Sequence, residues 1–95
     1  MKIAAIISYT PDKAKIQEAR PAHRQYLMGK LGEGKIAISG PLTDDSGGII
    51  VYEAGSAAEA EEILKADPFA KAGVFVSWEL KPWNPIICNR DLLPA

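Results

Sequence analysis

Two segments with the character of strands are apolar on both faces, and this limits the folds open to the chain more than any other feature. In residues 2–9 (KIAAIISY) and 47–54 (GGIIVYEA) apolar side chains stand at odd and even positions alike; Ile3 and Ile7, for example, alternate with Ile6. Successive side chains of a strand point to opposite faces. A sheet built from these segments therefore needs an apolar cover on both faces, unlike a sheet that leaves one face in water.

Turn residues and changes of apolar period divide the chain into six main elements. Apolar residues recur at helical spacing through residues 12–31, but Pro21 divides this stretch. The main helix is therefore expected to begin near residues 20–21, after a looser segment. Ser56 and Glu59 form a capping box that predicts a second helix to about Ala66, where Asp67-Pro68 stops it. The expected strands are residues 2–9, 35–40, 47–54 and 74–80, and residues 69–73 are expected to be a short connection.

This order predicts an α+β protein with a ferredoxin-like βαββαβ fold in a single domain, residues 1–95. Its antiparallel four-stranded sheet carries both helices on one face. The other face is also apolar, and a second copy of the chain is the simplest cover for it. We therefore expect a homodimer through the open sheet face, with a higher homo-oligomer as a possible extension.

Charge and cysteine content narrow the classes of partner. Eleven Lys and Arg residues oppose twelve Asp and Glu residues, without a basic run, so a nucleic-acid partner is not expected. No stretch approaches the roughly 20 apolar residues of a membrane span. Cys88 is the single cysteine, which fits a reducing cytoplasm. Asp44-Asp45 lack a histidine partner and are expected to be turn residues, so no metal site is predicted. No cofactor is predicted either.

The tail, residues 81–95, is rich in proline, which argues against regular structure there. It nevertheless contains large apolar residues at Trp83, Ile86, Ile87, Leu92 and Leu93. Burial of each is worth about 1.5–3 kcal/mol. We therefore expect the tail to dock on the body of the protein or on a partner subunit.

His23 is the only histidine, and it falls within the apolar arc of the first helical segment. It should therefore point inward, and near a helix start the dipole would favour the neutral imidazole that a general base needs. A structural histidine bonded to a backbone carbonyl is the alternative. If the two helices are neighbours, Asp67 could approach His23 and fix its tautomer, although sequence spacing alone does not show that contact.

Other residues are candidates for binding a substrate. Arg20 and Arg24 flank His23 and could hold an anion at a helix start. The segment Ser39-Gly40-Pro41 ends a strand, and its glycine permits the close approach of a ligand. Solvated arginines and a plain strand end are the alternatives.

The ordered motifs R-P-A-H (20–23), S-G-P (39–41) and A-D-P-F (66–69) resemble the YciI-like (YCII-related domain) family, nearly as far as Trp83. That family belongs to the dimeric α+β barrel superfamily. Its relatives include muconolactone isomerase-like enzymes and a dehydrochlorinase of chlorinated hydroxyhydroquinones. The resemblance implies a dimeric barrel with a His-Asp pair in the active site, matching His23 and Asp67.

The combined expectation is a small cofactor-independent enzyme. His23 would be the general acid/base, Asp67 would orient it, and Ser39 or the Gly40 backbone would bind a substrate oxygen. Proton abstraction beside an activated carbonyl or ring would then give isomerisation or elimination. The alternatives are a non-catalytic small-molecule-binding or accessory dimeric module, and a structural dimer without a ligand.

Overall fold

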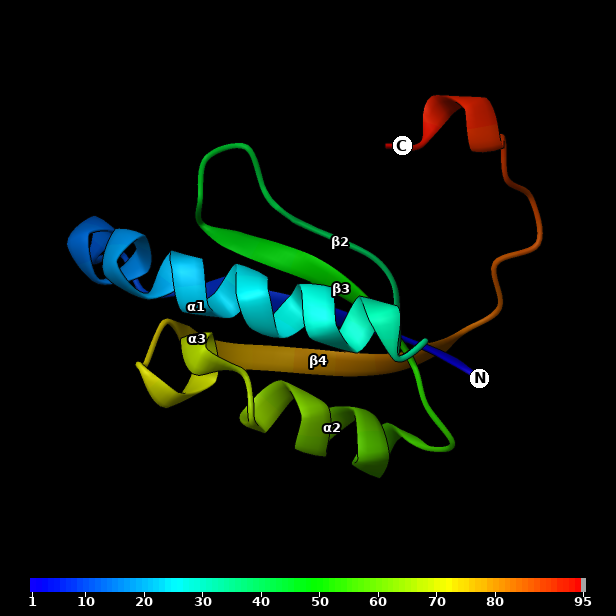
Figure 1. The fold of residues 1–95 in the computed structure, drawn as a ribbon, viewed down its shortest axis with the longest axis horizontal. Coiled ribbons are helices and arrows are strands. Elements are labelled where there is room, and N and C mark those ends of the chain that lie inside the picture. The colour runs from blue at the N-terminus through cyan, green and yellow to red at the C-terminus, as the bar shows by residue number, and fades with distance from the viewer. Residues whose placement is uncertain (95) are drawn as a thin grey trace.

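The computed structural model describes residues 1–94, and its centre is a four-stranded antiparallel sheet with strand order β2-β3-β1-β4 (Figure 1). This confirms the predicted α+β fold of βαββαβ type. The elements are β1 (Lys2–Tyr9), α1 (Lys13–Gly32), β2 (Ile36–Pro41), β3 (Gly47–Glu53), α2 (Ala57–Lys65), α3 (Pro68–Lys71), β4 (Phe75–Trp83) and a 3₁₀ turn (Arg90–Leu92).

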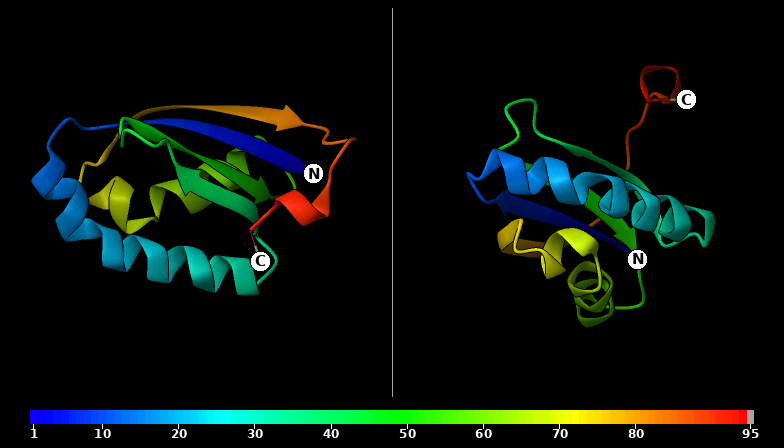
Figure 2. Two further views of the ribbon diagram at one scale, coloured as in Figure 1. Left: turned by 90° about the horizontal axis from the view of Figure 1, so that it is seen from above. Right: turned by 60° about the vertical axis from the view of Figure 1, so that its left-hand side comes forward.

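The helices cover only one face of the sheet (Figure 2, left). On that face Ile3, Ile7 and Tyr52 are buried in the core. On the other face Ile6 pairs with Ile49 across β1 and β3, and these side chains are 53% and 43% exposed. The structure of the single chain thus has the open apolar face that the sequence predicts, and the homodimer expected to cover it remains a prediction.

The first helix differs from the prediction. It runs without a break from Lys13 to Gly32, with Pro21 inside it, instead of beginning near Pro21. Asp12 caps its start by accepting a hydrogen bond from the backbone N–H of Lys15 at 3.1 Å, and Ile16 is buried in the core. Pro21 lies on the exposed side, where helix carbonyls tilt outward toward water. Capping and burial of the first turns therefore offset the bond that Pro21 lacks.

Two segments near the C-terminus are also more regular than predicted. Pro68–Lys71 is a short helix rather than a connection, since Asp67 caps it and Pro68 stands at its first turn. β4 extends beyond the expected Leu80 to Trp83 and includes Pro82. It is an edge strand, and proline is tolerated there because one side of the strand needs no ladder hydrogen bonds.

The tail beyond β4 arches away from the sheet (Figure 1). Its large side chains are exposed, with Ile87 at 95%, and its regular structure is limited to the 3₁₀ turn. A cavity of about 680 Å³ lies between Ile87 and Leu93 of the tail and Leu27 and Leu31 of α1. In the single chain the tail is thus not docked on the body, so the prediction of docking now concerns the partner subunit.

Within residues 1–94, none of the helices combines the length and the apolar character needed to cross a membrane.

Candidate active site

The contact between α1 and α3 brings together two residues 44 positions apart in the chain. His23 Nδ1 lies 2.7 Å from Asp67 Oδ1, and the pair is buried, with exposed fractions of 7% and 0%. An ionised carboxylate only accepts hydrogen bonds, so Nδ1 carries the proton and donates it. Nε2 is then the nitrogen with a free lone pair in the neutral ring.

Aromatic residues hold the imidazole in place. The ring of His23 stacks on Phe69 with centroids 3.8 Å apart and planes at 6°, and its edge faces Phe75 at 6.0 Å and 84°. Asp67 is held by the chain that follows it, because the Phe69 backbone N–H donates to its Oδ1 at 2.9 Å. The same short helix therefore supplies both the carboxylate and the ring that orient His23.

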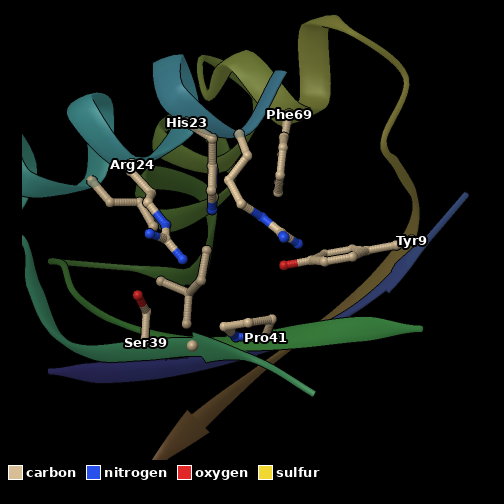
Figure 3. Close-up of a pocket in the computed structure, with 10 residues that line it drawn as sticks. Tyr9, His23, Arg24, Ser39, Pro41 and Phe69 are labelled. Atoms are coloured by element: carbon tan, nitrogen blue, oxygen red, sulfur yellow. The ribbon is translucent and has the colours of Figure 1, made fainter. Parts of the chain in front are cut away.

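A cavity of about 200 Å³ lies between α1 and the β2–β3 side of the sheet, and His23 points into it (Figure 3). The residues predicted to bind a substrate all line it: Arg20, Arg24, Ser39, Gly40 and Pro41. The structure therefore brings these candidates together with His23. A cavity of about 150 Å³ can hold benzene, so this one has room for a single ring with small substituents.

The two arginines differ in their partners. Arg20 donates to Asp45 Oδ1 at 3.0 Å, which ties α1 to the β2–β3 loop. Arg24 points toward the cavity in Figure 3 and forms no ion pair within residues 1–94. Both lie in the middle of α1, as His23 does. The helix start was expected to favour a neutral His23 and to help the arginines hold an anion. Neither effect applies to residues in the middle of a helix.

Tyr9 and Phe69 also line the cavity, and neither was predicted from the sequence to be a site residue. Phe69 could have been suspected, because it follows Asp67-Pro68 directly. Tyr9 is the last residue of β1, and no motif near it in the sequence indicates a functional site. Burial raises the pKa of Tyr9 to about 12; Asp67 and Asp45 also raise it, whereas Arg20 lowers it. Its hydroxyl is therefore protonated at neutral pH.

Two buried polar atoms near the pair have no hydrogen-bond partner within residues 1–94, Asp67 Oδ2 and the Tyr52 hydroxyl. Such atoms are uncommon, because each costs about 1–3 kcal/mol when unsatisfied. Burial raises the pKa of Tyr52, and the nearby charge of Asp67 adds to this. The polar groups of this region are thus placed at a cost in stability.

Metal-binding residue types are not clustered at the site. In the described part of the chain, no three His, Cys, Asp or Glu side chains lie close enough together to hold a metal ion. Cys88 is exposed in the tail.

The fold and site define a small α+β domain with a buried His-Asp pair at a ring-sized cavity, and comparison with known proteins gives its family. Residues 1–84 match the YCII-related domain, so the chain belongs to that family, as the motifs predicted. Over 69 residues it is 36% identical to uncharacterized protein YjpA of Bacillus subtilis (strain 168), covering 68% of this chain and 81% of that protein.

A similar solved structure is 5-chloro-2-hydroxyhydroquinone dehydrochlorinase (TftG) from Burkholderia phenoliruptrix AC1100, in complex with 2,5-dihydroxybenzoquinone. The TM-score is 0.77 and the identity 28%, over 88% of this chain and 94% of TftG. Family and neighbour together support a small enzyme-like domain.

Proposed function

We propose that the protein is a cofactor-independent enzyme that moves a proton on a small cyclic or carbonyl-containing substrate, with His23 as general acid/base. The observation that carries this proposal is the held imidazole: Nδ1 is bonded to Asp67 at 2.7 Å, and the ring points into a cavity of about 200 Å³. A base needs a fixed tautomer and a reachable lone pair. The bond at Nδ1 and the orientation of the ring support both conditions at Nε2.

The chemistry that this arrangement supports is proton abstraction beside a carbonyl. Nε2 takes the proton, the electron pair of the broken C–H bond moves onto the carbonyl oxygen, and Asp67 stabilises the imidazolium that forms. Return of the proton to another carbon gives isomerisation. Loss of a leaving group such as chloride gives elimination, and this is the reaction type indicated by the name of the dehydrochlorinase TftG.

The walls of the cavity favour a flat substrate. Phe69, Leu27, Ile50 and Pro41 offer apolar surface, and Arg24 and Ser39 add polar groups. The Ser39 hydroxyl or the Gly40 backbone would bind a substrate oxygen. TftG was solved with a hydroxylated quinone ring, a ligand of the same size class as the space here.

The test is exchange of carbon-bound protons for deuterium, followed by NMR, in a panel of small lactones, cyclic ketones and chlorinated hydroquinones. We expect the wild type to accelerate exchange, or chloride release, for at least one compound, and His23→Asn to abolish the effect. Equal rates in wild type and His23→Asn would contradict the proposal. Tight binding without exchange would instead favour a small-molecule-binding module.

A further inference from the structure

The hydroxyl of Tyr9 is a polar group that the proposed role of His23 does not use. Tyr9 is 8% exposed and lines the same cavity as His23. Figure 3 shows its oxygen pointing into the space below the His23 ring. Within residues 1–94 no hydrogen bond joins this hydroxyl to the protein, and its oxygen is not one of the two fully buried atoms without a partner. The hydroxyl is therefore open to the cavity, where a group that enters can accept its hydrogen bond.

Two features of the sheet place this hydroxyl. The register between β1 and β4 shifts at Ser8/Tyr9, so that Tyr9 pairs with Phe75; such bulges re-aim a side chain and are frequent beside active sites. On the neighbouring strand, a Cβ on Gly48 would lie 2.5 Å from the Tyr9 hydroxyl oxygen. The hydroxyl therefore occupies the space that Gly48 leaves open.

The ring of Tyr9 is held as firmly as that of His23. It meets Phe69 edge to face at 5.5 Å and stacks near Phe75 at 5.9 Å. Phe69 thus contacts Tyr9 and His23 together. Ser39, the other hydroxyl at the cavity, is exposed on an edge strand. A rigid donor costs less reorganisation than a mobile one when charge develops on a substrate.

We propose that the Tyr9 hydroxyl is the hydrogen-bond donor for the substrate oxygen that becomes negative when His23 removes a proton. This inference rests on the proposed function and adds to it that the substrate presents a carbonyl or phenolic oxygen to Tyr9. The C–H bond breaks, its electron pair moves onto that oxygen, and the proton goes to Nε2. Tyr9 keeps its own proton and donates only the hydrogen bond; its pKa near 12 is consistent with this.

The experiment measures binding of 4-nitrophenolate, a flat ring oxyanion, by its visible absorbance, and does not depend on knowing the substrate. Tyr9→Phe retains the ring and removes the hydroxyl. We expect it to weaken binding by about tenfold to a hundredfold, the loss typical of a hydrogen bond to a charged oxygen. The matched control is Tyr26→Phe, because the Tyr26 hydroxyl bonds the Ile63 carbonyl at 2.8 Å, away from the cavity lining. This control should bind as the wild type does.

A second variant moves the hydroxyl without removing it. Gly48→Ala would place a Cβ 2.5 Å from the Tyr9 hydroxyl oxygen, so it should displace the hydroxyl and weaken binding. Unchanged affinity in Tyr9→Phe, equal losses in Tyr9→Phe and Tyr26→Phe, or a wild type that does not bind 4-nitrophenolate would overturn the inference. Proton exchange with Tyr9-independent binding would leave the proposed function standing. Tyr9-dependent binding without exchange would support Tyr9 as the donor to a ligand oxyanion and would contradict the proton transfer by His23.

Discussion

Asp67 has two structural tasks in one buried side chain. Its Oδ1 accepts from His23 Nδ1 and from the Phe69 backbone N–H, and the latter bond caps the short helix α3. A change at this residue therefore alters the imidazole and the backbone beside it together. A role in orienting His23 must be tested with a change that keeps the cap.

Asp67→Asn is such a change. Since the Phe69 N–H requires an acceptor, the amide oxygen should take the place of Oδ1, so the Nδ1–H tautomer should persist while the negative charge is lost. We expect slower catalysis with an unchanged tautomer, read from the ¹⁵N shifts of the single histidine. Asp67→Ala loses both bonds, and its free energy of unfolding should fall by about 2–3 kcal/mol. A switch to the Nε2–H tautomer in Asp67→Asn would contradict this account.

Tyr9 and Tyr52 should make the stability of the folded state depend on pH in the alkaline range. Burial raises the pKa of Tyr9 to about 12 and also raises the pKa of Tyr52. A tyrosine in an unfolded chain titrates near 10. Between these values the folded state holds more protons, so stability should fall as pH rises from about 10 to about 12. Tyrosinate absorbance in native and urea-unfolded protein measures this. Titration near pH 10 in the native protein would refute the prediction for Tyr9.

At the scale of elements, the length of α1 is the main departure from the sequence prediction. A proline inside a helix costs about 3 kcal/mol, and this cost suggested a break at Pro21. The structure keeps the helix intact because Asp12 caps it and Ile16 packs in the core. Tertiary packing thus overrides a local preference, and it moves His23 from the first turn to mid-helix.

Pro21→Ala should therefore stabilise the protein. The change restores a backbone N–H to the middle of α1 and removes a helix penalty of about 3 kcal/mol. The unfolded chain becomes more flexible, which lowers this gain by up to about 1 kcal/mol. A net gain of about 2 kcal/mol is expected in urea unfolding. Pro68→Ala is the control, because Pro68 stands at a helix start where proline is favoured, and it should bring no gain. Equal effects at both positions would contradict the explanation.

At the scale of the whole molecule, the open sheet face and the tail are the parts that a single chain leaves exposed. A hollow of about 640 Å³ on this face is lined by Ile6, Ile38 and Ile49 from the sheet, by Trp83 at the end of β4 and by Pro94 from the tail. Apolar patches of this kind mark interaction surfaces. We propose that a second copy of the chain covers the face and contacts the tail.

Ile6→Lys tests the sheet face. Ile6 is 53% exposed, so the charge should not disturb the folded monomer, but in a dimer it would be buried without a partner. Analytical ultracentrifugation should show a dimer for the wild type and a monomer for the variant. Leu42→Lys is the control, because Leu42 is 44% exposed in the β2–β3 loop and should leave the dimer intact. A monomeric wild type at micromolar concentration would refute the proposal.

Removal of residues 85–95 tests the tail. The family match ends at residue 84, so the shortened chain should still fold. We expect a weaker dimer, because the apolar residues of the tail would no longer contact the partner. The dimer dissociation constant is compared for full-length and shortened protein. An unchanged constant would show that the tail has no part in assembly.

The sequence alone determined the order of the elements, the two-sided apolar strands, the capping of α2 and the motifs that make His23, Asp67 and Ser39 candidate site residues. These features depend on periodicity and turn chemistry, which act over a few residues. Only the tertiary structure decided that His23 touches Asp67, that α1 continues through Pro21, and that Tyr9 reaches the cavity. Each of these depends on contacts between residues far apart in the chain, and such contacts exist only once the helices pack on the sheet.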